Sequence, residues 1–251
     1  MTIDAREYMD TLFGPGALRV GLLDNRAGYI GAYHITDTYE PLNPVLNNQG
    51  ELEYTVTDRD ALGHFENGER ILPGYRMLAM MGLAMGIGND EVLPIGQMSN
   101  VEFQRIAVPG DTLVAVRNEQ HVGLLRENHV IARARAFPSK DGASALRFGE
   151  MFEMAAQTIG ANVAFHFAEG AQLYPLLSSC RLIRVHPIGN GDQLTVYVSS
   201  LHTEGNGTGP QYCASAEVYN HKGFKVGEVM DLRLLFTSHR VQKVLVRKGR
   251  N

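Results

Sequence analysis

The sequence reads Gly63-His64-Phe65-Glu66-Asn67-Gly68-Glu69-Arg70-Ile71-Leu72-Pro73-Gly74, and an apolar run over residues 75–88 follows at once. Pro73 and Gly74 stand where a helix over residues 76–85 is predicted to begin. Proline is tolerated in a first helical turn, and glycine lets a ligand approach the backbone closely. The helix is apolar on nearly every face, so it has to be covered on several sides. A polar histidine, a helix amino end and a buried helix are therefore predicted within one short span.

The spacing of His64, Gly68 and Pro73 is His-x3-Gly-x4-Pro. Together with Gly74 and the buried helix behind it, this pattern resembles the active-site motif of the hot-dog-fold 3-hydroxyacyl-[acyl-carrier-protein] dehydratase family of fatty acid and polyketide biosynthesis. The resemblance implies a hydro-lyase that converts 3-hydroxyacyl thioesters to trans-2-enoyl thioesters. It also implies that Phe65, Gly68 and Pro73 lie in the substrate-binding site.

The order of the predicted elements occurs twice along the chain. A buried helix is followed by a strand, a Gly-Asp turn and a three-strand meander, with the two turns at Pro109-Gly110-Asp111 and Asn190-Gly191-Asp192. Together with the resemblance, this repeat predicts an α+β, double hot-dog fold, in which an antiparallel β-sheet wraps each of two buried central helices. We expect an N-terminal unit over residues 1–142 that carries the catalytic His, and a C-terminal unit over 143–251 that carries the catalytic Glu.

The second half leaves little room for its own first strands between Gly142 and Glu153. Either the second unit is trimmed, or the first unit gives up an edge strand. Strands are predicted over residues 100–108, 112–122, 129–137 and 144–148, and the second apolar helix over 152–164.

Each half holds what the other lacks. In the dehydratase family an acidic residue lies five positions after the motif glycine, but this chain has Ala79 there. The second predicted helix carries Glu153 and Gln157, four residues apart and hence on one helix face. This pair resembles the Glu-x-x-x-Gln signature of the same family. The pattern predicts one active site built from both halves.

Dehydration needs a base for the proton beside the thioester carbonyl, an acid for the departing hydroxyl, and a donor for the charge on the thioester oxygen. His64 is the predicted base because imidazole titrates near neutral pH. The Gly74 N–H at the helix start is the predicted oxyanion donor. Glu153 is the predicted acid, with Gln157 orienting its carboxyl group.

Plainer interpretations of these residues stay open at this stage. His64 could be a loop histidine without a role, and Glu153 could lie on the surface at a helix start or at the end of a strand. For the whole chain, the alternatives are an enoyl isomerase or a thioesterase of the hot-dog type, and a non-catalytic subunit that binds an acyl chain or a partner.

Composition narrows the class of protein. The chain has 251 residues, 44% of them hydrophobic and 20% charged, with a net charge of −4, which does not favour a nucleic-acid partner. No apolar run approaches the roughly 18 residues of a membrane span, and the start lacks signal-peptide character, so we expect a cytoplasmic protein. The two cysteines, Cys180 and Cys213, are expected to be free thiols.

No metal or redox cofactor is expected, because the sequence shows neither a His/Cys cluster at ligand spacing nor a glycine-rich nucleotide loop. The expected partner is an acyl carrier protein that carries the 3-hydroxyacyl chain. A basic cluster near the end of the chain could dock this acidic carrier; it comprises Arg240, Lys243, Arg247, Lys248 and Arg250. A homodimer and a complex with other synthase components both stay open.

Overall fold

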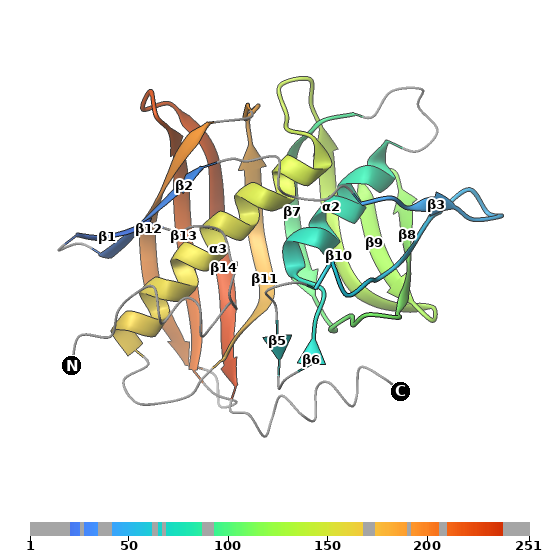
Figure 1. Ribbon diagram of the computed structural model, residues 1–251, viewed down its shortest axis with the longest axis horizontal. Helices are drawn as coiled ribbons and strands as arrows, with labels where there is room; N and C mark the ends of the chain where they lie inside the picture. The colour runs from blue at the N-terminus through green and yellow to red at the C-terminus, as the bar shows by residue number, and fades with distance from the viewer. Residues whose placement is uncertain are drawn as a thin grey trace.

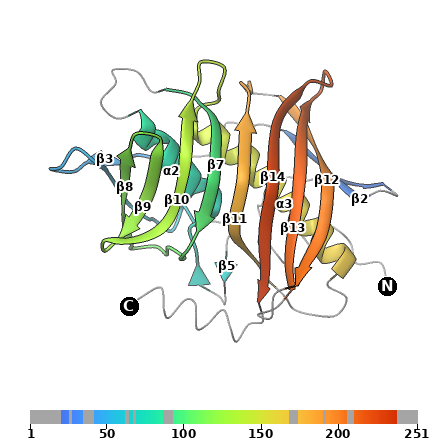
Figure 2. The same ribbon diagram turned by 180° about the vertical axis from the view of Figure 1, so that it is seen from behind.

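Two helices lie on the same face of one large antiparallel sheet (Figure 1), and the view from behind shows the other face of that sheet (Figure 2). The computed structural model describes residues 21–25, 28–34, 42–61, 65–66, 69–86, 93–167, 174–189, 192–205 and 210–237. Neither helix in these ranges combines the length and the apolar character that crossing a bilayer requires.

The two helices are α2 (Gly74–Met85) and α3 (Ala145–Phe167). From its outer edge inward, the first half of the sheet contains β3 (Val45–Leu46), β4 (Leu52–Thr55), β8 (Thr112–Asn118), β9 (His121–Arg126), β10 (His129–Pro138) and β7 (Ile95–Phe103). From the centre outward, the second half contains β11 (Tyr174–Val185), β14 (Lys225–Thr237), β13 (Pro210–Asn220), β12 (Gln193–Gly205), β2 (Gly28–His34) and β1 (Gly21–Asn25). A separate hairpin pairs β5 (Phe65–Glu66) with β6 (Glu69–Arg70).

The two halves of the sheet join through an antiparallel pairing of β7 with β11, in which Val101 lies opposite Cys180 and Met98 opposite Ile183. Counted outward from this seam, the strands of the two halves match in order: β7, β10, β9 and β8 on one side correspond to β11, β14, β13 and β12 on the other. The exception is the pair β1 and β2, which comes first in the chain but joins the second half, because β2 pairs with β12. The segment ahead of β3 thus supplies the strands for which the chain after Gly142 has no room. Of the two alternatives drawn from the sequence, the structure has the second: the N-terminal part of the chain gives up strands to the second half of the sheet.

Three of the predicted strands differ from the structure. The strand predicted over residues 144–148 is wrong, because Ala145 begins α3 and the Ser144 Oγ accepts a hydrogen bond from the Arg147 N–H at 3.3 Å, as an N-cap residue does. The single strand predicted over 112–122 is two strands, since Glu119 takes a left-handed conformation with φ 52° and turns the chain into β9. Strand β7 begins at Ile95, before the predicted residue 100.

The core lies between the helices and the sheet. In α2 every residue except Gly74 and Leu83 is buried, as the apolar run predicted. Strands β8 and β9 alternate, so that Leu113 and Leu124 point inward while their sequence neighbours are more exposed. The C-terminal end of α2 is held by Arg117, whose Nη1 donates to the Met85 carbonyl at 2.8 Å.

Both cysteines are free thiols, as the sequence predicted, and both are buried. Burial raises the pKa of Cys180 to about 12, and burial likewise raises the pKa of Cys213. A raised thiol pKa keeps the sulfur protonated and weakly nucleophilic near neutral pH. We expect iodoacetamide to leave both thiols of the native protein unmodified and to alkylate both in urea, as measured by intact mass. Rapid alkylation of the native protein would show that the sheet opens locally around these strands.

Candidate functional site

Helices α2 and α3 cross in close contact because glycines replace side chains at the crossing. A Cβ atom on Gly149 would lie 2.5 Å from the carbonyl oxygen of Tyr75, and one on Gly82 would lie 2.9 Å from the Ala145 Cβ. Position 149 of α3 thus contacts the start of α2, and position 145 contacts a point nearer its end. The two helices run antiparallel here, with their backbones in direct contact.

This crossing places Glu153 at the amino end of α2. Glu153 lies one turn beyond Gly149, which is a rise of about 6 Å along α3. Because Gly149 already contacts the first turn of α2, this rise carries Glu153 to the level where α2 begins. The electrostatics agree: burial raises the pKa of the Tyr75 hydroxyl, Arg76 opposes that shift, and the carboxylates of Glu153 and, to a smaller extent, Glu150 add to it.

The side chains of Glu153 and Gln157 form a buried pair. They are 4% and 2% exposed, and the Gln157 Nε2 donates a hydrogen bond to the Glu153 Oε1 at 2.9 Å. This burial excludes the alternative of a surface glutamate, and the course of α3 excludes a position at a strand end. The amide limits the rotation of the carboxyl group and so gives it a defined direction.

The amino end of α2 lies among apolar side chains. Pro73 precedes it in an extended conformation with no side-chain cap, and the N–H of a first helical residue has no acceptor within its own helix. A Cβ on Gly74 would lie 2.9 Å from the Leu177 Cδ1 and 3.2 Å from the Phe103 Cε1. The Phe103 ring also packs on Phe152, with 6.1 Å between centroids. The backbone donor of Gly74 thus lies against apolar side chains, where electrostatic interactions are strong.

The structure describes only some of the predicted site residues. His64 and Gly68 lie outside the described residues, as does the basic cluster near the end of the chain, and Phe65 is described only as part of β5. The remaining predicted site residues are described: Pro73 and Gly74 lie at the start of α2, and Glu153 and Gln157 lie on α3 one and two turns beyond its contact with Tyr75.

Sequence reasoning missed the polar residues around the first turn of α2. Arg76 is buried at 4% exposure, and its Nη2 lies 3.8 Å from the Oδ1 of the equally buried Asp60. A signal was present, since an arginine inside an otherwise apolar helix needs a buried partner.

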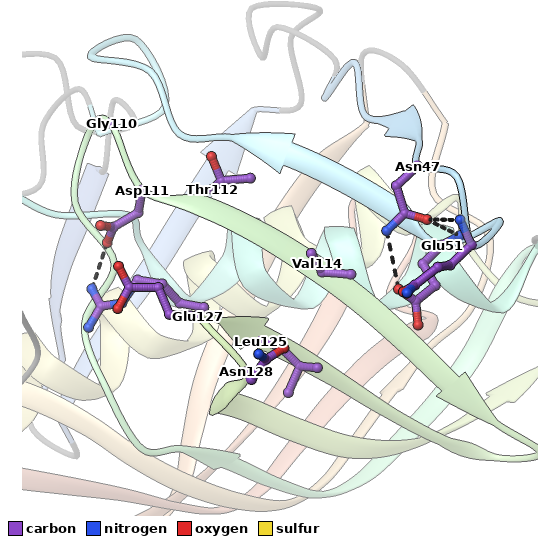
Figure 3. A pocket seen from close by; sticks show the side chains of 11 residues that line it. Asn47, Glu51, Gly110, Asp111, Thr112, Val114, Leu125, Glu127 and Asn128 are labelled. Carbon is purple, nitrogen blue, oxygen red and sulfur yellow. Dashed lines mark hydrogen bonds and ion pairs between the residues drawn. The ribbon is translucent and has the colours of Figure 1, made fainter. Parts of the chain in front are cut away.

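A pocket of about 470 Å³ lies elsewhere in the first half of the sheet (Figure 3). One end holds Asn47 and Glu51, joined at 3.2 Å, and the other holds Asp111, which accepts from Arg126 at 2.7 Å. Its lining residues belong to β8, β9 and neighbouring turns, and include none from the helices or from the strands of the seam. None of its lining residues is a predicted site residue, so the pocket is distinct from the candidate site.

Three side chains outside the candidate site are of the residue types that bind metals. His202, Glu204 and Cys213 carry ligand-type atoms within 4.8 Å of one another. However, the Nε of Arg233 lies 3.4 Å from a Glu204 oxygen, and burial raises the pKa of the Cys213 thiol. A neighbouring cation and a protonated sulfur both oppose metal binding, so we assign no metal to this group.

No protein-family model matches the sequence, and no curated protein matches it. Solved structures do match the fold. The dehydratase domain from the CurJ module of curacin polyketide synthase is 8% identical, with a TM-score of 0.56 over 82% of this chain and 98% of that domain. The dehydratase domain of PpsC from Mycobacterium tuberculosis, in complex with C12:1-CoA, is 12% identical, with a TM-score of 0.50 over 88% of this chain and 98% of that one.

A third match is a trans-acyltransferase polyketide synthase enoyl-isomerase. It is 13% identical, with a TM-score of 0.53, and the alignment covers 78% of this chain and all of that one. At such low identities the likeness concerns the arrangement of the backbone, and that arrangement agrees with the antiparallel sheet and the two helices described above. This chain has the hot-dog fold of polyketide synthase dehydratase domains.

Proposed function

We propose that this chain is a double hot-dog dehydratase that removes water from 3-hydroxyacyl thioesters in polyketide or fatty acid biosynthesis. The observation that carries the proposal is the buried Glu153–Gln157 pair beside the amino end of α2. A carboxyl group held by an amide and a helix amino end in apolar surroundings supply an acid and an oxyanion donor.

In this proposal one active site performs a single elimination. His64 removes the proton from the carbon next to the thioester carbonyl, and the charge that develops on the thioester oxygen is stabilised by the Gly74 N–H. Glu153 donates its proton to the 3-hydroxyl group, the carbon–oxygen bond breaks, and water leaves with the trans-2-enoyl thioester as product. After the reaction the His64 imidazolium holds the proton taken from carbon, and the proton lost by the Glu153 carboxyl group has left in the water.

The proposed units follow the predicted division near residue 142, with one addition. We assign β3 to β10 and α2 to the first unit, and α3 with β11 to β14 to the second. The hairpin of β1 and β2 is assigned to the second unit, because β2 pairs with β12. Phe65, Gly68 and Pro73 are proposed to contact the substrate.

The proposed substrate is an acyl chain on an acyl carrier protein. One solved domain of this fold belongs to a polyketide synthase, and another is described with C12:1-CoA bound. A thioester of coenzyme A and one of a carrier protein share the acyl thioester that the proposed site acts on. The basic residues between Arg240 and Arg250 are proposed to contact the acidic carrier.

An enoyl isomerase is the second candidate, because a solved enoyl-isomerase shares the fold. Shifting a double bond uses a base and an acid on one acyl chain but releases no water. Dehydration is favoured here because an orienting amide holds the carboxyl group of Glu153, as suits proton delivery to one leaving hydroxyl.

The test is mass spectrometry of 3-hydroxyacyl thioesters, on coenzyme A and on a carrier protein, after incubation with the protein or with His64→Ala. Loss of the mass of water in the wild type alone would support the proposal. A separate incubation with a 2-enoyl thioester, with the isomers resolved by chromatography because their masses are equal, tests the second candidate: a shifted double bond without any dehydration would replace the proposal with the isomerase. Release of the free acid would point to a thioesterase. No reaction of either the coenzyme A or the carrier-protein thioester would indicate the non-catalytic alternative, a subunit that binds an acyl chain or a partner.

Removing the amide of Gln157 should slow turnover without destroying the site. We expect Gln157→Leu to lower kcat about 10-fold to 100-fold, as for a hydrogen bond to an ionisable group, with little change in KM. The control is Thr158→Val, since the Thr158 Oγ1 donates to the Met154 carbonyl on the same helix. An unchanged kcat in Gln157→Leu would mean that the amide does not orient the acid.

A further inference from the structure

Asp60 and Arg76 form an ion pair in the interior, beside the candidate site. They are 5% and 4% exposed, and the Arg76 Nη2 lies 3.8 Å from the Asp60 Oδ1. Arg76 belongs to the first turn of α2, two residues after Gly74, and Asp60 precedes His64 by four residues in the chain. The pair therefore links a residue that precedes the sequence motif in the chain to the first turn of the helix that follows it.

The Asp60 carboxylate has several further donors. Its Oδ2 accepts from the Thr57 N–H at 2.7 Å and from the Thr57 Oγ1 at 2.6 Å. The hydroxyl of Tyr54 also reaches it: burial raises the pKa of Tyr54, and the hydrogen bond to Asp60 raises it further. The carboxylate is thus fixed to the end of β4 before it contacts Arg76.

Arg76 is fixed from its other side. The guanidinium carbon lies 5.7 Å from the centroid of the Tyr75 ring, within the range of a cation–π contact. Tyr75 is the residue whose carbonyl contacts Gly149 of α3. A chain of contacts therefore runs from β4 through Asp60, Arg76 and Tyr75 to the helix that carries Glu153.

Stability alone does not explain this pair. A buried ion pair commonly contributes no more than apolar residues of the same volume would, and a cation in the first turn of a helix opposes the helix dipole. Its place beside Gly74 gives the pair a geometric consequence, because an intact pair holds the amino end of α2 close to the turn that follows β4.

We infer that Asp60 and Arg76 are positioning residues, a buried clamp that fixes the amino end of α2 relative to the turn at residues 57–61, which precedes His64 in the chain. The inference rests on the proposed function, since it assigns the clamp to the geometry of dehydration. A displacement of about 1 Å between reacting groups can lower a rate about 100-fold. The clamp acts on turnover more than on substrate binding, because neither side chain is assigned to contact the substrate.

The experiment compares Asp60→Asn, Arg76→Lys and Arg76→Met with a matched pair of controls, Asp111→Asn and Arg126→Met. Arg126 is also buried, and its Nη1 lies 2.7 Å from the Asp111 Oδ2, but this pair lines the pocket of Figure 3. We expect kcat to fall about 100-fold in Arg76→Met and Asp60→Asn with KM nearly unchanged. Arg76→Lys should recover part of kcat because it keeps the charge, and the control variants should lose melting temperature but keep kcat.

Hydrogen exchange gives a second measurement that does not depend on turnover. The peptide over residues 57–61 should lose protection in Arg76→Met and Asp60→Asn, and keep it in Arg126→Met. A wild-type protein that dehydrates no substrate would contradict the proposed function, and exchange would then decide whether the clamp exists. Unchanged kcat and unchanged exchange in the folded clamp variants, or an equal loss of kcat in the controls, would overturn the inference.

Discussion

Glu153→Gln is expected to lower the turnover of a 3-hydroxyacyl thioester about 10² to 10⁴-fold, the usual contribution of a positioned acid. Glutamine keeps the shape of the side chain and can still pair with Gln157, whose amide offers both a donor and an acceptor. The substitution removes only the proton that the leaving hydroxyl needs. Because the side chain is 4% exposed and packed at the helix crossing, water has little access to replace it. The measurement is kcat, with the melting temperature recorded to show that the fold is kept.

The matched control for this variant is Glu150→Gln. Glu150 lies one turn earlier on α3, is as deeply buried, and accepts from the Arg147 Nη1 at 2.6 Å. We expect this control to lower stability through the loss of an ion pair while kcat stays close to that of the wild type. Full activity in Glu153→Gln would show that Glu153 is not the acid. An equal loss of kcat in Glu153→Gln and Glu150→Gln would show a general effect on α3 rather than the loss of one proton donor.

Gly149→Ala is expected to lower both stability and turnover. A Cβ at this position would lie 2.5 Å from the Tyr75 carbonyl oxygen, which belongs to the backbone and cannot rotate away. The two helices would have to separate, at a cost of about 1–3 kcal/mol, typical of overpacking. Separation moves Glu153 away from the amino end of α2, so we expect kcat to fall at least about tenfold in the protein that remains folded. Thermal unfolding measures the first effect and kcat the second.

Gly123→Ala is the control for the added methyl group. A Cβ on Gly123 would lie 3.6 Å from the Ala132 carbonyl oxygen, an ordinary contact distance. This variant should keep its melting temperature within a few degrees and its kcat unchanged. If Gly149→Ala behaved in the same way, the close contact of α2 with α3 would not determine the geometry of the site.

Much of the fold followed from local patterns in the sequence. The apolar run after Pro73 predicted a buried helix, and the structure has α2 at residues Gly74–Met85. Alternation and turn residues located most strands of the meanders. The prediction was wrong at residues 144–148, where a serine N-cap outweighed the strand-like composition of the residues after it. Local propensity cannot weigh such a cap against a strand when the segment is short.

The candidate site was predictable as a set of residue types but not as an arrangement. The spacing of Glu153 and Gln157 predicted one helix face, because the α-helical period is a local property. The ion pair of Asp60 with Arg76 joins elements that pack only in the folded chain. From the sequence, an arginine in an apolar run indicates that a buried partner exists but not which residue it is.

The sequence by itself determined which segments are buried helices, which side chains could supply an acid, and that the second half lacked room for its first strands. Only the tertiary structure decided where those strands come from: β2 pairs with β12, a contact between residues far apart in the chain. The tertiary structure also decided that Glu153 stands at the amino end of α2, because the crossing depends on the absence of a side chain at Gly149 against a carbonyl of another helix. Local periodicity follows from backbone geometry within a few residues, whereas contacts between distant segments depend on the packing of the whole core.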